Sequence, residues 1–180
     1  MELRALKEKD AVGMLEWMHD PEVNCFFGFD EKAITKKSVI DFIAASNIDE
    51  NRKKNLHLAI VDDQDEYLGT ISLKNIDDTV KSAEYSIGIR RTAQGQGIGS
   101  TATKKILQIA FKELELNRVY LNVISDNIIA IKMYEKIGFQ FEGKFRNHIM
   151  IHGAIKSLSW YAVLREEFII IKSGETYEIG

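Results

Sequence analysis

The spacing of apolar positions in the first fifty residues predicts two helices. After a short apolar start at residues 3–6, apolar side chains recur at roughly helical spacing over residues 9–19. Asp20-Pro21 ends this run, because the residue before a proline disfavours helical backbone. A second helix is expected from Thr35, and its apolar positions are Val39, Ile40, Phe42 and Ile43.

The period of the pattern changes in the middle of the chain. Apolar residues alternate along 56–61, a polar turn follows at 62–66, and residues 67–73 and 83–89 read as two further strands. Successive strands joined by short polar turns predict an antiparallel meander. Helical spacing returns over residues 99–116, and the β-branched run at 119–124 completes a strand, helix and strand unit.

The last part of the chain predicts one more helix and two strands. The helix should span 127–137, with Gly138 where a left-handed C-terminal cap belongs, and strands are expected at 139–145 and 156–164. Pro21 is the only proline, and no Gly/Ser-rich run marks a linker. We therefore expect one α/β (α+β mixed) domain over residues 1–168, with a central sheet, flanking helices and a C-terminal tail at 169–180.

Composition and charge exclude several classes of protein. The 180 residues are 45% hydrophobic, which suffices for one buried core. No apolar run approaches the ~20 residues that cross a bilayer, and the N-terminus lacks the layout of a secretion signal. The net charge of −3 provides no field that would gather nucleic acid. We expect a cytoplasmic protein with neither a membrane nor a nucleic-acid partner.

The positions of the cysteine and the histidines predict no metal site. A single cysteine, Cys25, excludes an internal disulfide and a Cys-rich zinc site, and fits a reducing compartment. No His or acid stands at a recognisable spacing from it, so we expect a buried structural cysteine rather than a nucleophile. The histidines at 19, 57, 148 and 152 show no metal-ligand spacing either, so no metal is expected.

The most specific chemistry lies in a glycine loop between the strand at 83–89 and the helix that follows. Gly95, Gly97 and Gly99 occupy every second position, so main-chain N–H groups can turn toward one centre beside a new helix N-terminus. Such a loop binds phosphate. It lacks the Gly-Lys-Ser/Thr of an ATP-binding loop, and Ser100 stands where a dinucleotide-binding loop needs its third glycine. An ordinary glycine-rich turn is the alternative.

The pattern Gln94-x-x-Gly97-x-Gly99 resembles the pyrophosphate-binding motif of the GNAT acetyltransferases. The segment 127–139, with Asn127, Ala130, Tyr134 and Gly138-Phe139, resembles the second signature of that family. The resemblance extends from Leu3 to about Glu167. It is greatest to the branch that contains ribosomal-protein N-terminal, polyamine and nucleotide-aminosugar acetyltransferases. It implies a GNAT fold whose mostly antiparallel sheet is splayed at the cofactor strand, with acetyl-CoA as the cosubstrate.

The resemblance also implies which residues hold coenzyme A. Backbone amides would grip its pyrophosphate at Gln94, Gly95, Gln96, Gly97, Ile98, Gly99 and Ser100. The main chains of Ile87 and Ile89 would pair with the pantetheine arm, which then behaves like an added strand, while their side chains pack in the core. Gly88 is compatible with a β-bulge beside the splay.

One face of the helix at 127–137 should look toward the cofactor. Asn127, Ala130 and Tyr134 share that face, and the two polar residues lie about 10 Å apart along the axis. The resemblance implies that Asn127 hydrogen-bonds the pantetheine and that Tyr134 protonates the departing thiolate. The alternatives are a helix N-cap for Asn127 and a core position for Tyr134.

An amine attacks a thioester only when it is uncharged, so a base is required near pH 7. Glu84 is our candidate, because it alternates with Ser86 on the strand face opposite Tyr85 and Ile87, where many family members keep a base. It could act directly or through water. The alternative is an exposed carboxylate that only attracts the ammonium group. Direct transfer within a ternary complex is expected.

The acceptor is the least defined part of the expectation. We expect a small-molecule amine, either an aminosugar nucleotide or a polyamine; a protein N-terminus or lysine and a non-catalytic CoA-binding module are the alternatives. Phe26, Phe27 and Phe29 belong either to an acceptor-side loop or to the core. The loop and turn at 146–153 should lie near the acceptor, although Ser157 stands where the branch often carries Asp. The apolar residues 168–171 could cover a second subunit of a homodimer or fold back.

Overall fold

A seven-stranded mixed sheet forms the centre of the computed structural model, which describes residues 1–30, 32–172 and 175–178. Its strand order is β1-β2-β3-β4-β5-β7-β6. The strands are β1 Glu2–Ala5, β2 Leu56–Val61, β3 Tyr67–Asp77, β4 Ser82–Ile89, β5 Arg118–Ile124, β6 Gln140–Ile151 and β7 Ala154–Leu164. Every neighbouring pair is antiparallel except β4 and β5, which are parallel. The expected fold class and the β2–β3–β4 meander are confirmed.

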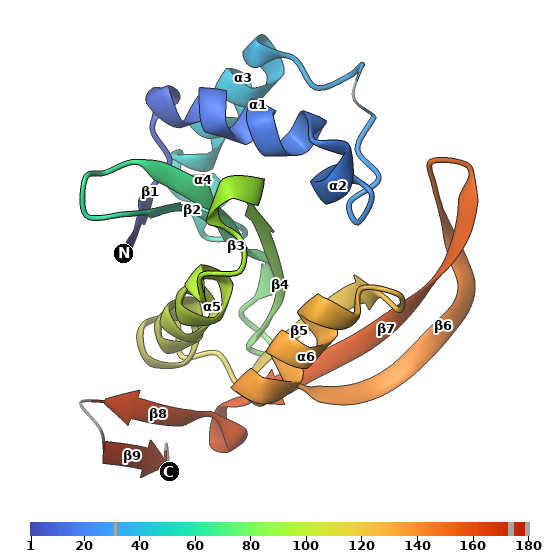
Figure 1. Cartoon of the computed structure of the whole chain (residues 1–180). Coiled ribbons are helices and arrows are strands. Elements are labelled where there is room, and N and C mark those ends of the chain that lie inside the picture. Colours follow the sequence, from blue (N-terminus) through green and yellow to red (C-terminus); the bar gives the residue numbers. More distant parts are fainter. Residues whose placement is uncertain (31, 173–174, 179–180) are drawn as a thin grey trace.

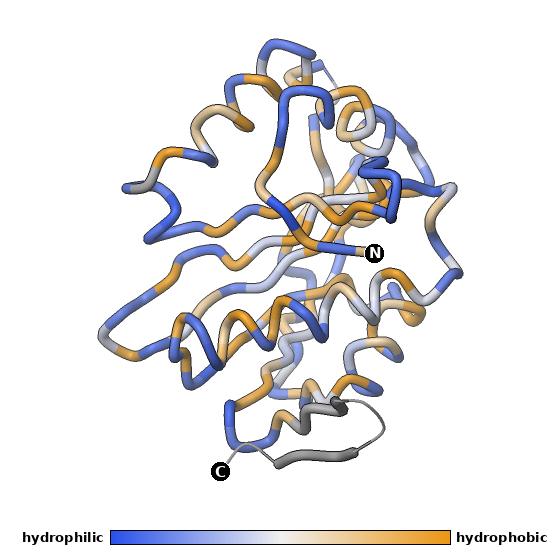
Figure 2. Tube along the Cα trace, turned by 90° about the vertical axis from the view of Figure 1, so that its left-hand side faces the viewer, coloured by the Kyte–Doolittle hydropathy of each residue, from blue (hydrophilic) through white to orange (hydrophobic). Residues whose placement is uncertain are grey.

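Helices cover both faces of this sheet (Figure 1). One face carries α1 Ala11–His19, α2 Pro21–Asn24, α3 Lys36–Ser46 and α4 Asp49–Arg52, and the other carries α5 Ile98–Gln108 and α6 Ile128–Ile137. Strand β2 explains why two cores form: Leu58 and Ile60 pack toward α5, whereas Ala59 and Val61 pack toward α1 and α3. Strict alternation in a strand covered on both faces therefore builds two apolar layers. Figure 2 shows the hydrophilic turns at the periphery of these layers.

The ends of the helices follow the sequence signals. Thr35 caps α3 by accepting a hydrogen bond from the Ser38 amide at 3.1 Å, and Gly138 ends α6 at φ +118°. Helix α1 ends at His19 as expected, but Pro21 then occupies the first turn of α2. The expected helix at 99–116 is divided into α5 and a π-helical turn, Ile109–Glu113. Short 3-10 turns occur at Glu8–Asp10, Arg91–Ala93 and Arg165–Glu167.

The β6–β7 hairpin is longer than the sequence predicted. Most of the expected loop at 146–153 is strand, because pairing with β7 resumes at Ile149 after an irregularity beyond Phe145. Asn147 at φ +50° lies within that irregularity. The turn itself is confined to His152 and Gly153. The hairpin therefore extends past the rest of the sheet toward α1 and α2 (Figure 1).

The sheet splays between β4 and β5, as expected. In the described ranges these strands pair only at Ser82↔Arg118, Ala83↔Val119 and Glu84↔Tyr120. Beyond Glu84, β4 keeps its partner β3, while β5 continues along β7. Gly88, whose sequence was compatible with a bulge, lies in regular pairing, because the ladder with β3 runs from Gly69↔Ile89 to Lys74↔Glu84 without a register shift.

The end of the chain forms a small separate sheet. Strand β8, Ile169–Lys172, pairs with β9, Glu175–Glu178, in antiparallel fashion. Phe168 folds back: it is 3% exposed and lies 5.5 Å from the ring of Phe111. Residues 173–174 and 179–180 of the expected tail lie outside the described residues, as do the side chains of 169–171, and the division at residue 168 stays a prediction.

Candidate functional site

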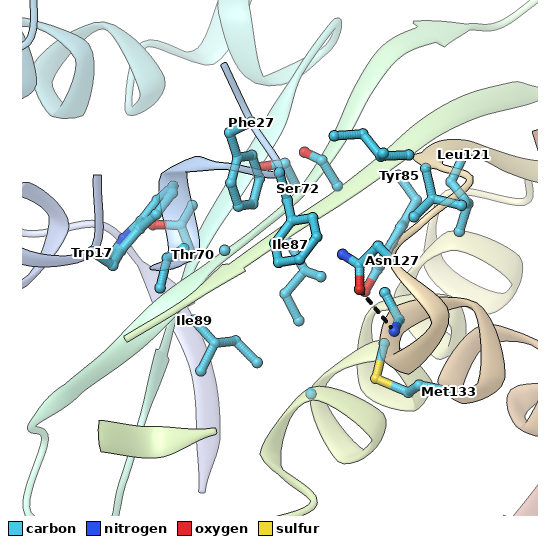
Figure 3. A pocket seen from close by; sticks show the side chains of 18 of the residues that line it. Trp17, Phe27, Thr70, Ser72, Tyr85, Ile87, Ile89, Leu121, Asn127 and Met133 are labelled. Carbon is cyan, nitrogen blue, oxygen red and sulfur yellow. Dashed lines mark hydrogen bonds between the residues drawn. The ribbon is translucent and has the colours of Figure 1, made fainter. Parts of the chain in front are cut away.

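A cavity of about 890 Å³ occupies the splay and continues onto the α1 side of the sheet. Its lining comes from β4, the loop at 94–100, α6, α1, the segment 26–29, and the inner faces of β2, β3, β5, β6 and β7. Figure 3 shows Trp17 and Phe27 on one side of β4 and Asn127 and Met133 on the other. One continuous space therefore reaches both faces of the sheet.

The glycine loop forms a cradle of main-chain donors at one end of this cavity. Gly95 and Gly97 adopt φ +76° and +75°, and no atom lies within 4 Å of a Cβ built at either position. In the part of the chain that the structure describes, no oxygen accepts a hydrogen bond from the N–H groups of residues 95–100. The first N–H groups of α5 belong to this set. The cradle therefore fits an anion such as a diphosphate.

Side chains brace the cradle from behind. Gln94 donates from Nε2 to the Ile89 carbonyl at 3.1 Å, and Gln96 donates to the Thr92 carbonyl at 2.9 Å. A Cβ at Gly99 would lie 3.1 Å from Ile89 and 3.2 Å from the Met133 sulfur. The loop is thus held close to β4 and to α6 at once. Ile98 and Ser100, in the first turn of α5, also line the cavity.

The open edge of β4 faces the cavity from Tyr85 onward. The Arg90 amide donates to Leu68 of β3 at 2.9 Å, so the alternate residues Ile87 and Ile89 direct their main-chain groups away from β3. The Ile89 carbonyl already accepts from Gln94, which leaves the Ile87 groups and the Ile89 N–H for an added strand. Both side chains pack against the core around α5, as expected. The absence of a side chain at Gly88 leaves room for the Trp17 ring, because a Cβ there would lie 2.6 Å from the indole.

The predicted face of α6 lines the cavity. Asn127, Ala130 and Tyr134 all contribute to its wall. The Asn127 side-chain oxygen accepts from the Ala130 amide at 3.2 Å, drawn as the dashed line in Figure 3, so Asn127 is a helix N-cap. Its amide nitrogen donates to no group among the described residues. The capping role and a ligand contact are therefore compatible.

Tyr134 is both a core residue and a cavity residue. It is 7% exposed and packs between the rings of Tyr85 at 5.8 Å and Phe139 at 5.7 Å. Burial raises the pKa of its hydroxyl, because the phenolate would lose its hydration. The hydroxyl therefore keeps its proton at neutral pH and can donate it.

Glu84 lies at the last β4–β5 pair, where the two strands separate. Its carboxylate accepts from the Lys74 ammonium at 2.8 Å and from the Asn75 amide at 3.0 Å. The side chain is 20% exposed, so it is not a freely exposed carboxylate. It shares the α1 face with Ser86 and Gly88, opposite Tyr85, as the alternation predicted. Both expectations for its role stay open.

His57 and Ser72, to which the sequence gave no role in this site, lie on the same face. Strand register aligns His57 with Ser72 and Ser72 with Ser86, and the His57 ring lies 2.7 Å from the Ser72 hydroxyl. Burial, and then the charge of Lys74, lowers the pKa of His57, so the imidazole is neutral near pH 7. The alternation of residues along β2 places His57 on the strand face opposite Leu56 and Leu58. Its position in the cavity depends on the register of β2, β3 and β4, which the sequence does not give.

The segment 26–29 forms an aromatic wall of the cavity. The rings of Phe27 and Phe29 stack 5.3 Å apart, and Trp17 lies 5.2 Å from Phe27. Phe26 also lines the cavity and is 41% exposed. Gly28, at φ +67°, places this wall against Ile151 of β6, which a Cβ would approach to 3.1 Å. The phenylalanines are thus packed residues and cavity residues together.

Cys25 and Ser157 are two further residues that the sequence analysis considered. Cys25 is exposed rather than buried, because α2 turns Val23 and Asn24 inward and leaves Cys25 at its C-terminal end, with Sγ 3.3 Å from the Glu22 carbonyl. Ser157 is a structural residue, since its hydroxyl accepts from the Asn147 amide at 3.0 Å beside the β6 irregularity. Ile149 and Ile151 of the former loop segment do line the cavity.

Over residues 1–30, 32–172 and 175–178, His, Cys, Asp and Glu form no group of three or more that could hold a metal ion. No helix in the same ranges has the length and hydropathy to cross a bilayer.

Comparison with known proteins identifies the fold. Residues 1–140 match the family model described as an acetyltransferase (GNAT) domain. A Bacillus subtilis protein named provisionally as a ribosomal N-acetyltransferase is 37% identical over 100 residues, which span 56% of this chain and 55% of that protein. A Vibrio cholerae spermidine N(1)-acetyltransferase is 27% identical over 157 residues, covering 87% and 82%.

A solved structure agrees with the family match. The crystal structure of spermidine N-acetyltransferase from Vibrio cholerae in complex with CoA and spermine has a TM-score of 0.84 and 23% identity, and the match covers 92% of this chain and 96% of that one. At that identity the likeness concerns the fold. The family model covers more than half of the chain, and its glycine loop, splay and α6 face lie in one cavity. The chain therefore belongs to the GNAT acetyltransferases, a family of transferases that use acetyl-CoA.

Proposed function

We propose that this chain is an acetyl-CoA-dependent N-acetyltransferase that acetylates a primary amine of a small molecule by direct transfer in a ternary complex. One observation carries the proposal. The donor cradle at 95–100, the open edge of β4 and the side chain of Tyr134 line a single cavity that continues to the opposite side of the sheet. The relatives named as spermidine N(1)-acetyltransferases support an amine acceptor.

The cofactor half of the site fits coenzyme A. The free N–H groups of residues 95–100 and the N-terminal end of α5 would hold the diphosphate, and Gln94 would keep the loop against β4. Ile87 and the Ile89 N–H would pair with the pantetheine as a strand would. The amide nitrogen of Asn127 would donate to the same arm. The bound cosubstrate supplies a thioester that an uncharged amine can attack.

Tyr134 is the proposed general acid. Its raised pKa keeps the hydroxyl protonated, and the hydroxyl would protonate the departing sulfur as the carbon–sulfur bond breaks. The ring contacts with Tyr85 and Phe139 hold the phenol in one orientation. Positioning of this kind removes the entropic cost of arranging the groups during the reaction.

Glu84 is the proposed base, acting directly or through water. It lies where β4 and β5 separate, and the Lys74 and Asn75 contacts fix its carboxylate there. Substituting Glu84→Gln keeps the shape and removes the proton acceptor. As a base, Glu84 would contribute about 10²-fold or more to kcat. If it only attracts the ammonium group, Glu84→Gln will raise the amine KM and leave kcat and its pH profile unchanged.

The test of the overall function is release of free thiol from acetyl-CoA in the presence of amines. A panel of monoamines, polyamines, aminosugar nucleotides and peptides should include acceptors that raise thiol release above hydrolysis, with a mass increase of one acetyl group on the amine. Silence of every acceptor class, with coenzyme A still bound, would remove the enzyme proposal. Turnover only with peptides would replace the small-molecule acceptor by a protein.

A further inference from the structure

We infer, on the basis of the proposed function, that the acceptor is a monoamine with one positive charge and a flat, apolar body, such as an arylalkylamine, rather than a polyamine. The inference concerns the part of the cavity on the α1 face of the sheet. There Trp17, Phe27 and Phe29 form one wall, and the polar floor runs from His57 to Glu84.

The charges around this chamber balance without a ligand. Among its described lining residues the charged side chains are Glu22, Lys74 and Glu84. Glu84 is paired with Lys74 at 2.8 Å, and Glu22 is paired at the rim with Arg91 at 3.1 Å. A monoamine brings one positive charge, for which the Glu84 carboxylate, shared with Lys74, is the counter-ion on the floor of the chamber. A polyamine would bring additional ammonium groups into a chamber that holds no unpaired carboxylate for them, and burying an unpaired charge is costly.

The aromatic wall does not form a cage for a second ammonium group. Phe27 and Phe29 stack on each other with their planes 5° apart, so each ring covers one face of the other. Trp17 directs its N–H to the Tyr67 hydroxyl at 2.9 Å and lies over Gly88. A cation needs the exposed face of a ring within about 6 Å, ideally from several sides. Ring edges and one remaining face suit the flat side of an apolar group better.

A second wall of the chamber is aliphatic. It consists of the small apolar cluster Ile124, Ile149, Ile151 and Leu158 from β5, β6 and β7. Gly28 brings the aromatic segment into contact with Ile151, so the two walls meet at that end. A slot between rings and branched aliphatic chains, with a few polar groups at its floor, binds an apolar body and orients its one polar end.

The experiment compares three amines with the full chain and saturating acetyl-CoA: 2-phenylethylamine, propylamine and spermidine. We expect kcat/KM for 2-phenylethylamine to exceed that for each of the others at least tenfold. Equal or better use of spermidine, or of a nucleotide-linked aminosugar, would overturn the inference while leaving the enzyme proposal intact. Binding of 2-phenylethylamine without turnover of any amine would remove the enzyme proposal but keep the ligand class.

A matched pair of variants locates the effect. Phe27→Leu removes one ring of the wall and should lower kcat/KM for 2-phenylethylamine about fivefold, with little change for propylamine. Phe141→Leu makes the same change on β6 at a ring that packs on Tyr161 outside the cavity, and should change neither value. Equal effects of Phe27→Leu on both amines would show that the ring only stabilises the fold, which would also overturn the inference.

Discussion

The two ends of the cavity are built in different ways. The cofactor end is built mainly of main-chain groups from one continuous segment, residues 87–100, held in place by Gln94 and by two glycines in left-handed backbone conformations, with Asn127 and Tyr134 of α6 beside it. The acceptor end consists of side chains from α1, segment 26–29, β2–β4 and the β6–β7 hairpin. The first end depends on backbone conformation, and the second depends on long-range packing. Substitutions should therefore affect the two ends separately.

The largest effect should come from Tyr134, the proposed general acid. Tyr134→Phe should lower kcat by about 10²- to 10⁴-fold, because the departing sulfur loses its proton donor. The Kd for coenzyme A, measured by calorimetry, should stay unchanged. Tyr161→Phe is the control, since that hydroxyl contacts Glu135 at 3.1 Å outside the cavity. Full activity of Tyr134→Phe would show that Tyr134 serves only in packing and is not the proton donor.

The next effect should be confined to the cofactor end. Gly97→Val places a branched side chain at φ +75°, which costs about 1–2 kcal/mol and turns N–H groups out of the cradle. The Kd for coenzyme A should rise at least tenfold, while the amine KM at saturating cofactor should not. Gly143→Val, at an open position of β6, controls for the added side chain. A rise in amine KM alone would break the separation of the two ends.

A smaller effect should be confined to the acceptor end. Gly28→Ala strains the backbone at φ +67° and pushes the aromatic segment from Ile151. The amine KM should rise about five- to tenfold, in line with a cost of about 1–1.4 kcal/mol, and the Kd for coenzyme A should not change. Gly153→Ala carries similar strain, at φ +78°, in an open turn. If both variants behave alike, general strain and not the wall explains the change.

The smallest effect concerns stability rather than binding. Burial lowers the pKa of His57 from 6.5, so the unfolded chain binds the proton more tightly than the folded one. The free energy of unfolding should therefore fall as pH drops below about 7 and level off below the folded pKa. His57→Gln should flatten this dependence in urea titrations, whereas His148→Gln, at an exposed position, should not. An unchanged slope in His57→Gln would place the pH dependence elsewhere.

The sequence sufficed to predict features that depend on residues close together in the chain. The helical and alternating periods predicted the order of the longer elements but not α2, α4, β8 or β9, Gly138 predicted the end of α6, and the spacing of the glycines predicted the cradle. The face of α6 with Asn127 and Tyr134 also followed, because three and seven residues bring side chains to one side of a helix.

Features that depend on distant partners could not be predicted. The His57–Ser72 contact requires the register of two strands, and the need for glycine at position 88 arises from Trp17, seventy-one positions earlier in the chain. Cys25 looked like a small apolar residue for the core, but the orientation of the short helix α2 leaves it exposed. The length of the β6–β7 hairpin depended on pairing that resumes beyond an irregular stretch.

The short parallel pairing of β4 with β5 divides the sheet into two parts that are joined at one end. Strands β1–β4 form one part and β5, β7 and β6 form the other, and three residue pairs link them. In the proposed reaction, a pantetheine arm paired with the open edge of β4 would break no strand pair, because the main-chain groups of Ile87 point away from β3. Coenzyme A would therefore bind and leave while both parts of the sheet keep their hydrogen bonds.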